Sequence, residues 1–380
     1  MTEKAADTGL QLFSTATDDN RLELSLRRVP IPTPGAEEVV VRIEATPLNP
    51  SDLGLLLSAA DPASFAVTAS GDQPVTTGTI PAALIRLVAA RKGKPMPVGN
   101  EAAGTVVKAG ESAEAQALLG KTVAIAGGAM YTQNRLFKAR DCLVLPEGAT
   151  AEEGASSFVN PMTALSMVSV LRRAGEKALV HTAAASNLGQ MLVKLCQAEG
   201  IPLVNIVRSA EQAALLRSLG ATHVCNSSSA EFMRELIAAI TETGAFLAFD
   251  AIGGGPLAGQ ILTAMEAAAS ARTPGFSVYG SAQHKQVYIY GRLDNAPTQL
   301  AGGFGLAWGV GGWLLTPYLQ RLGAEEVATM RRRVAENLRT IFASHYTRRI
   351  TLQEALQPEN ILAYSKRATG EKYLITPAAS

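Results

Sequence analysis

The feature that most constrains the fold is a regular alternation of short apolar strands and helices in the second half of the chain. It begins with the strand ALVHTA at residues 178–183 and a helix over 188–199. The later strands are expected in IPLVNIV, ATHVCN, AFLAFDAIG and FSVYG, and each of the first three is followed by a helical segment. Strands that alternate with helices of this length predict βαβ units and a parallel sheet.

The first half of the chain has a different character. Residues 37–141 contain strand-like runs such as EEVVVRIEATPL and EAAGTVVKAG, separated by glycine turns. Helical segments follow, with Thr150 as an N-cap and Gly175 as a terminator. A length of 380 residues, 47% hydrophobic and 18% charged, allows a sizeable core and favours two domains.

Charge and cysteine usage exclude several classes of protein. The chain has 34 Lys and Arg against 33 Asp and Glu, and a net charge of +1 predicts no binding to nucleic acid or to an anionic membrane. Its three cysteines, Cys142, Cys196 and Cys225, form no CxxC pair. This pattern favours a reducing compartment, the cytoplasm, and argues against structural zinc and disulfides. Residues 1–20 lack the apolar core of a secretory signal.

One uncharged stretch, residues 300–319, is long enough to span a bilayer. Its six glycines and Pro317 make it a poor helix, and no basic flank precedes it. We therefore expect no membrane span, and instead a buried segment packed against a ligand or a second subunit.

The turn after the first strand, AAASNLG at 183–189, stands where a nucleotide-binding unit has a glycine-rich loop. Ser186 or Asn187 can cap the following helix, whose N-terminus offers free N–H groups to a pyrophosphate. Ala184 and Ala185 are nearly as small as glycine, and Gly189 allows close packing of helix on strand. Many α/β domains have a small-residue turn, so the turn alone leaves both interpretations open.

The end of the next strand favours one cofactor. An NAD site places an acid about 20 residues past the turn to bind the ribose 2′-hydroxyl. Here Arg208 and Ser209 follow the strand, and a cation suits a 2′-phosphate. The alternative is a solvated arginine at a strand end. Together, the turn and Arg208 predict NADPH.

Four segments together resemble the medium-chain dehydrogenase/reductase superfamily, over about residues 22–377. They are VVVRIEATPLNPSDLGLL, MPVGNEAAGTVVKAGE, SSFVNPMTALSMV and ATGEKYLITP. The resemblance implies an α/β fold with a doubly wound Rossmann sheet and a GroES-like β-rich catalytic domain. The implied domains are a catalytic domain at 1–157, a Rossmann NADP-binding domain at 158–317, and a return to the catalytic domain at 318–380.

Two departures from the family pattern bear on metal chemistry. Zinc members place a cysteine where this chain has Asn49 and a histidine where it has Asn100. A neutral amide is a poor zinc ligand beside thiolate and imidazole. The four-cysteine structural zinc loop is also missing. We therefore expect no metal and a place in the zinc-free branch of quinone oxidoreductases, alkenal/enone reductases and enoyl-thioester reductases, the last of which has the most similar turn.

A further departure concerns the proton donor. Many zinc-free relatives carry a tyrosine two residues after the aspartate of NPSD, where this chain has Gly54. Tyr131 is a candidate substitute, and the alternative is a half-buried strand residue. His181 and His223 lie on expected strands, His284 and His345 lie outside the signature motifs, and all four are expected to be structural.

By resemblance and position, Asn49 and Tyr131 are the candidate catalytic residues. Tyr279, Gly280 and Ser281 are expected to end the fifth strand beneath the cofactor. The candidate cofactor-binding residues are Asn49, Asn160, Thr163, Ala185, Ser186, Asn187, Leu188, Arg208, Ser209, Ile252, Tyr279, Gly280, Ser281, Trp313 and Lys372.

The expected function is hydride transfer from NADPH to a quinone or enone acceptor in a zinc-free oxidoreductase. Two alternatives stay open: an NADPH-dependent enoyl-thioester reductase, and a non-enzymatic NADPH-binding sensor. We expect a homodimer in which KQVYIYGRL supplies a β-rich edge and residues 300–319 an apolar patch.

An insertion at residues 58–97 is longer than ordinary loops. It contains a predicted helix, PAALIRLVAARKG, in which Leu84, Leu87 and Val88 share a face. The insertion is expected to form a lid over the active site, with a surface embellishment or a dimer contact as alternatives.

Overall fold

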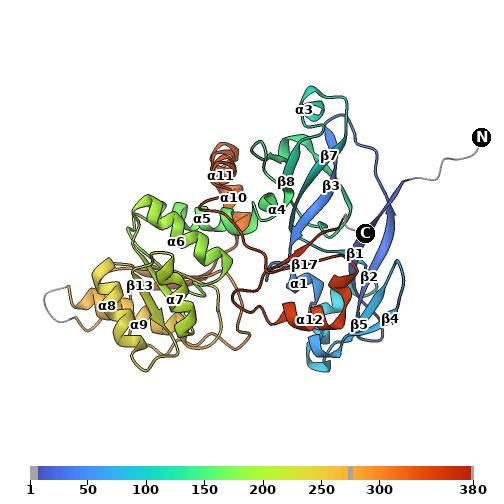
Figure 1. Ribbon diagram of the computed structural model, residues 1–380. Coiled ribbons are helices and arrows are strands. Elements are labelled where there is room, and N and C mark those ends of the chain that lie inside the picture. Colours follow the sequence, from blue (N-terminus) through green and yellow to red (C-terminus); the bar gives the residue numbers. More distant parts are fainter. Residues whose placement is uncertain (1–6, 273–276, 378–380) are drawn as a thin grey trace, which may run out of the picture. The chain divides into compact units, whose positions relative to one another are not determined.

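The computed structural model describes residues 7–272 and 277–377, and the chain divides into two compact units (Figure 1). Unit 1 comprises Met1–Val159 and Arg331–Ser380, and unit 2 comprises Asn160–Met330. Unit 2 extends past residue 317 because three helices are tied together: α5 (Val159–Arg173), α10 (Leu315–Leu322) and α11 (Ala324–Glu336). The hydroxyl of Tyr318 donates to Ser169 Oγ, and Arg173 pairs with Glu326.

Unit 2 is built on a six-stranded parallel sheet in the order β13-β12-β11-β14-β15-β16. This is the doubly wound arrangement of a Rossmann fold, with β11 at the point where the strand order reverses. The predicted fold class is therefore confirmed. The strands are β11 (Leu179–His181), β12 (Leu203–Val207), β13 (His223–Asn226), β14 (Leu247–Asp250), β15 (Lys285–Ile289) and β16 (Trp308–Gly312).

Helices cover this sheet, and its strands β11, β12 and β14 are buried at every residue. Helices α8 (Phe232–Thr243) and α9 (Leu257–Ser270) lie side by side and pack their apolar stripes on β11 and β12 (Figure 1). Right-handed crossovers place α6 (Asn187–Glu199) and α7 (Ala210–Ser218) on the opposite face. The carboxyl ends of the strands, where doubly wound sheets bind ligands, thus lie at one edge.

The fifth strand of the sheet is not the predicted one. FSVYG was expected there, but its first residue, Phe276, lies outside the described residues, and 277–280 form a turn. The strand is instead β15 (Lys285–Ile289), which pairs with β14 and β16. KQVYIYGRL therefore does not supply a free sheet edge for a dimer, because β15 is an interior strand and the edge strands are β13 and β16.

Unit 1 contains two β-sheets. One has the order β4-β5-β2-β1-β6, and the other has the order β10-β8-β7-β3-β18-β17 with β9 also paired to β3. The strands are β1 (Thr8–Ala16), β2 (Arg21–Pro30), β3 (Glu38–Pro47), β4 (Ala66–Ala69), β5 (Val75–Thr79), β6 (Met96–Pro97), β7 (Glu101–Ala109), β8 (Thr122–Ala126), β9 (Asn134–Lys138), β10 (Leu143–Val144), β17 (Arg348–Ile350) and β18 (Tyr373–Ile375).

Within the described residues, five short α-helices complete this unit. The N-cap predicted at Thr150 is present, and the structure shows it as part of a capping box in which Thr150 and Glu153 each bond the other's backbone N–H. Strand β18 pairs antiparallel with β3, so the end of the chain joins the sheet of its first half. The helices are α1 (Leu53–Leu56), α2 (Ile85–Val88), α3 (Ala113–Gln116), α4 (Ala151–Gly154) and α12 (Pro358–Ser365).

The insertion at residues 58–97 supplies β4, β5 and β6, which extend the sheet of β1 and β2. Phe65 and Ile80 enter the core of unit 1. The predicted helix is broken into a 3₁₀ turn, α2 and another 3₁₀ turn. Leu84, Leu87 and Val88 therefore do not share one buried face, as had been expected. Val88 is buried, but the side chain of Leu87 is 74% exposed, because consecutive residues cannot both face the core from so short a helix.

Residues 300–319 are not buried within the single chain, and their expected packing against a ligand or a second subunit stays a prediction. They comprise a loop, β16 and the start of α10, and Leu306 and Leu314 are exposed. None of the helices in the described ranges is long and apolar enough to cross a membrane.

Candidate functional site

The turn between β11 and α6 is the centre of the candidate cofactor site in unit 2. Ser186 is the N-cap of α6, and its hydroxyl accepts the N–H of Gly189 at 3.1 Å. Ala183 adopts a left-handed conformation, with φ of 48°, which turns the chain sharply out of β11. Ala184 and Ala185 are buried, while Ser186 and Asn187 are partly exposed at the helix N-terminus. A helix N-terminus of this kind suits a pyrophosphate.

Gly189 is required by the approach of the helix to its own strand. A Cβ at this position would lie 2.1 Å from the carbonyl oxygen of Ala184, far inside van der Waals contact. The one glycine that the turn retains therefore serves packing, as a Rossmann turn needs. The other small residues of the turn, Ala184, Ala185 and Ser186, leave the space that the phosphates of a cofactor would need.

Arg208 lies at the carboxyl end of β12, beside the end of β11. Its backbone is held on both sides: its N–H donates to Gln212 Oε1 at 3.0 Å, and its carbonyl accepts the hydroxyl of Ser228 at 2.9 Å. Ser209 caps α7. The side chain of Arg208 is exposed at the strand edge where the cofactor turn lies. The residues present fit a cofactor that carries a 2′-phosphate.

The end of β14 is fixed by Asp250. Its carboxylate accepts the hydroxyl of Thr182 at 2.7 Å and the N–H groups of Ile252 and Gly253. The network links the carboxyl ends of β11 and β14 and places Ile252 at the same edge as the turn. The predicted residues Asn160 and Thr163 lie at the start of α5.

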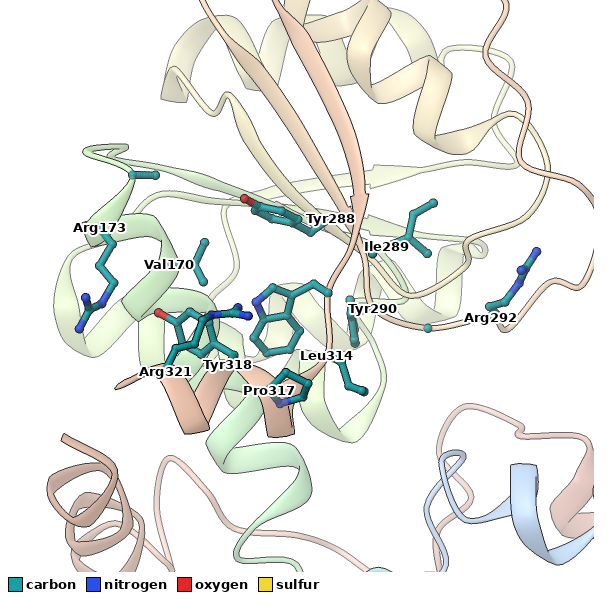
Figure 2. Close-up of a pocket in the computed structure, with 14 residues that line it drawn as sticks. Val170, Arg173, Tyr288, Ile289, Tyr290, Arg292, Leu314, Pro317, Tyr318 and Arg321 are labelled. Atoms are coloured by element: carbon teal, nitrogen blue, oxygen red, sulfur yellow. The ribbon is translucent and has the colours of Figure 1, made fainter. Parts of the chain in front are cut away.

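A cavity of about 790 Å³ lies beside the carboxyl end of β15 (Figure 2). Trp313 points into it, packed edge-on against Phe249 and tilted against Tyr318. The indole Nε1 of Trp313 is buried and has no hydrogen-bond partner within the described residues. Further lining residues come from α5, β15 and α10, among them Val170, Tyr288 and Arg321.

Tyr279, Gly280 and Ser281 do not end a strand at this edge. They precede β15 and therefore lie toward the opposite edge of the sheet. Ser281 is buried, and its N–H and hydroxyl donate to the carboxylate of Glu266. Lys285 donates to the same carboxylate at 2.6 Å. These buried hydrogen bonds give Ser281 a structural role in unit 2.

Unit 1 holds a second polar cluster, centred on Glu101 at the start of β7. Asn49, which follows β3, donates its Nδ2–H to Glu101 Oε1 at 2.8 Å. The other oxygen, Oε2, accepts the N–H groups of Phe158 and Val159 at 2.8 and 2.9 Å. Asn49 Oδ1 is left buried and without a partner within the described residues. Glu101 thus fixes the orientation of Asn49 and the start of α5.

Asp52 is the second buried carboxyl of this cluster. Its Oδ2 accepts the N–H of Asn49 at 2.7 Å. Burial raises the pKa of Asp52 from 3.8 to about 7, and the charge of Glu101 adds to the rise. Burial also raises the pKa of Glu101, although Lys372 and the three N–H donors counteract it. Burial and the charge of Glu101 together favour the protonated form of Asp52 up to about pH 7.

Tyr131 is fully buried rather than half-buried. Its hydroxyl donates to the carbonyl oxygen of Pro47 at 3.3 Å, and its ring belongs to the hydrophobic core. Burial raises its pKa well above 10, and the charge of Asp52 adds to the rise. A fully buried phenol that holds its proton this tightly is poorly suited to direct contact with an acceptor.

Lys372, just before β18, lies in the same unit. Its Nζ donates to Ser156 Oγ at 2.8 Å, and Ser156 Oγ shares a hydrogen bond of 2.8 Å with the hydroxyl of Tyr346. Sequence reasoning named Lys372 but missed Ser156, Tyr346 and Glu101. Local patterns carry no signal for them, since Ser156 and Lys372 are 216 residues apart.

The two positions that hold zinc ligands in zinc members of the family carry hydrogen-bonded amides in this chain. Asn49 is committed to Glu101, and Asn100 Nδ2 donates to Ser51 Oγ at 3.2 Å. Across residues 7–272 and 277–377, no three His, Cys, Asp or Glu side chains gather in a way that could hold a metal ion.

Comparison with known proteins agrees with this geometry. Residues 188–290 match the family "Zinc-binding dehydrogenase", and this match covers neither Asn49 nor Asn100. The chain is 25% identical over 237 residues (62% of this chain) to the rat synaptic vesicle membrane protein VAT-1 homolog. It is 28% identical over 208 residues (53% of this chain) to the mitochondrial enoyl-[acyl-carrier-protein] reductase of Xenopus tropicalis. The chain spans about half the length of these curated relatives, 51% of each.

A solved structure matches along the whole chain. It is a protein of Mesorhizobium loti assigned as an NADPH:quinone reductase, with a TM-score of 0.72 and 25% identity, covering 99% of this chain and 100% of that one. The family match and the structural match along the whole chain support the resemblance to the medium-chain dehydrogenase/reductase superfamily that the sequence indicated.

Proposed function

We propose that the chain is a zinc-free, NADPH-dependent oxidoreductase that reduces a quinone or enone acceptor. The observation that carries the proposal is the carboxyl edge of the parallel sheet. There the capped turn at Ser186 and the exposed Arg208 lie at the ends of neighbouring strands. Bound NADPH would supply a hydride.

The residues of unit 2 have separate roles in this proposal. The N–H groups of α6 after Ser186 bind the pyrophosphate, and Arg208 with Ser209 binds the 2′-phosphate. Ile252, held by Asp250, borders the same edge. Asn160, Thr163 and Trp313 remain proposed cofactor contacts. Tyr279 and Gly280 are no longer favoured, because they precede β15.

The chemistry of Asn49 and Asn100 supports a reaction without zinc. Both side chains are amides, and the amide of Asn49 is occupied by Glu101. An alcohol dehydrogenation that depends on a zinc-polarised oxygen would need a different donor set. An electron-poor alkene or quinone accepts a hydride without such polarisation.

Two observations support a quinone or enone acceptor. The solved structure that matches along the whole chain is assigned as an NADPH:quinone reductase. The cavity of unit 2 is lined by Tyr288, Trp313 and Tyr318, whose flat rings suit a planar acceptor. Trp313 Nε1 is a buried donor that an acceptor oxygen could satisfy.

A test is anaerobic NADPH oxidation by the purified chain across a panel of quinones, enones and enoyl thioesters. Turnover of quinones or enones is expected, with no loss of activity on chelation and no stoichiometric metal by elemental analysis. NADPH binding without turnover of any acceptor would refute the enzymatic proposal and favour a sensor. Stoichiometric zinc, with activity lost on chelation, would refute the metal-free part.

An enoyl-thioester reductase is the second candidate. It is favoured by the match to the Xenopus tropicalis enoyl reductase and by the glycine-poor turn at residues 183–189. In the same panel, a kcat/KM for enoyl thioesters that exceeds those for quinones and small enones would select it.

A further inference from the structure

We infer that the cavity of unit 2 binds an aromatic carboxylate, and that Arg321 and the indole N–H of Trp313 hold its carboxylate group. The inference rests on the proposed function, because such a ligand would be the quinone or enone acceptor. The binding site itself needs unit 2 alone, since every residue that lines the cavity falls between residues 170 and 321.

The first observation is the charge of the cavity lining. Among the described residues its charged side chains are three arginines, Arg173, Arg292 and Arg321, and it has no acidic one. Arg173 is paired with Glu326, and Figure 2 shows Arg292 on the opposite side of the cavity from Arg321. Within residues 7–272 and 277–377, Arg321 makes no ion pair. One uncompensated positive charge therefore borders this side of the cavity, which favours a ligand with a single negative charge.

The second observation is a neutral donor inside the cavity. Trp313 follows β16, and its backbone N–H donates to the carbonyl oxygen of Ile289 at 2.8 Å, which extends the pairing with β15 by one residue. Its ring is held between Phe249 and Tyr318. The indole Nε1 is buried and has no hydrogen-bond partner within the described residues. Because a buried N–H without an acceptor is unfavourable, a ligand oxygen that accepts this N–H gains affinity.

The third observation is that both donors lie against the same ring. The Cζ atom of Arg321 is 5.8 Å from the centroid of the Tyr318 ring, and the centroid of the Trp313 ring is 5.6 Å from it. Figure 2 shows Arg321 and Tyr318 together on one side of the cavity. The hydroxyl of Tyr318 donates to Ser169 Oγ at 2.9 Å, which fixes the ring. A carboxylate has two oxygens, so it can accept from the guanidinium and from the indole at once.

The rest of the cavity suits a flat apolar body. Val170, Tyr288 and Pro317 belong to its lining, and its volume of about 790 Å³ lies in the range of small-molecule sites. Arg321 is exposed, so a ligand can reach the guanidinium from solvent, whereas the indole N–H lies inside. The ligand class is therefore a planar, conjugated ring that carries a carboxylate.

The test uses para-carboxybenzalacetone, a planar enone with a carboxylate on its ring, and the neutral methyl ester of the same molecule. Isothermal titration calorimetry measures both affinities for the full chain loaded with NADP⁺, which cannot deliver a hydride. The wild type should bind the acid about 10–150-fold more tightly than the ester, as expected for a charge-assisted contact. This difference should shrink as the salt concentration rises. Equal wild-type affinity for acid and ester overturns the inference without any variant.

Two arginine variants locate the charge. Arg321→Gln should abolish the preference for the acid, because glutamine keeps polar atoms but not the charge. Arg217→Gln is the control, since Arg217 is an exposed arginine of α7 that does not line the cavity, and it should match the wild type. Thermal unfolding shows whether each variant is folded. A folded Arg321→Gln variant that retains the preference overturns the inference.

The indole N–H is followed by nuclear magnetic resonance. The chain has two tryptophans, Trp308 and Trp313, so nitrogen-labelled protein gives two indole N–H signals, and Trp313→Phe identifies which is which. Saturation with the acid should move the Trp313 proton downfield as its new hydrogen bond forms. A Trp313 signal that does not move at saturation overturns its part in the site.

Replacement of NADP⁺ by NADPH separates this inference from the proposed function. The acid should then be reduced, with a lower KM than its ester. Binding of the acid through Arg321 without turnover of any acceptor supports the site and contradicts the proposed function. Turnover of neutral quinones or enones, with no preference for the acid, overturns the inference and leaves the proposed function standing.

Discussion

Burial opposes ionisation of both buried carboxyls of unit 1, Asp52 and Glu101, and hydrogen bonds counteract it. Glu101 accepts three N–H donors, from Asn49, Phe158 and Val159, and these stabilise its anion. Asp52 accepts the N–H of Asn49, and its Oδ1 makes no hydrogen bond within the described residues. Burial nevertheless raises the pKa of both carboxyls, that of Asp52 to about 7.

This arrangement makes a prediction for stability against pH. The pKa of Asp52 is about 7 in the folded chain and 3.8 ordinarily, so the folded state binds more protons between these values. Its contribution to stability is present below pH 3.8 and is lost as pH rises through about 7. Asp52→Asn should therefore stabilise the chain relative to wild type by up to about 4 kcal/mol at pH 8, and much less at pH 4.5. Urea unfolding at both pH values measures this, and an equal difference at both would contradict it.

Arg208 carries a second prediction at this scale. Arg208→Ala should abolish most of the preference for NADPH over NADH, because a charge-assisted phosphate contact is worth about 1.5–3 kcal/mol, or roughly 10–150-fold. Affinity for NADH should barely change. Fluorescence titration measures the binding of each cofactor. The control is Arg217→Ala, which lies in the helix that follows Arg208, α7. A wild type that binds both cofactors equally would show that Arg208 makes no such contact.

At the scale of elements, the turn after β11 and helix α6 depend on the close approach of Gly189 to the carbonyl group of Ala184. Gly189→Ala would place a Cβ 2.1 Å from the carbonyl oxygen of Ala184, so the helix must move away from the strand. We expect a loss of about 1–3 kcal/mol of stability together with weaker NADPH binding. Gly54→Ala is the matched control, since a Cβ there meets no atom within 4 Å. Thermal unfolding and NADPH titration measure both effects, and equal behaviour of the two variants would contradict this account.

The insertion is also understood at this scale. Because β5 pairs with β2, and Phe65 and Ile80 enter the core, residues 58–97 are part of the architecture of unit 1. The guanidinium of Arg91 strengthens this attachment by donating to the carbonyls of Ser14 and Leu55. Replacement of the whole insertion by a linker would therefore remove core as well as any lid. A lid remains a hypothesis that smaller changes, confined to the exposed Leu87, can address.

At the scale of the whole molecule, β16 leaves one edge of the parallel sheet available. We predict a homodimer in which this edge and the exposed Leu306 and Leu314 are covered by a second copy. Light scattering at micromolar concentration should give the dimer mass. Leu306→Glu should shift the equilibrium toward monomer, while the same change at the exposed Leu119 of unit 1 should not. A monomeric wild type would contradict the prediction.

The sequence by itself determined those features that depend on short-range patterns. Periodicity from residue 178 onward predicted the βαβ order, and Ser186, Gly189 and Arg208 stand where a local strand–turn–helix pattern places them. Tertiary structure decided the rest. FSVYG and KQVYI both look like strands, and the pairing of β15 with β14 and β16 selects the second. Lys372, Ser156 and Glu101 come together only when distant segments of the chain fold. Hydrogen bonds and desolvation act through space, so no local sequence pattern predicts this cluster.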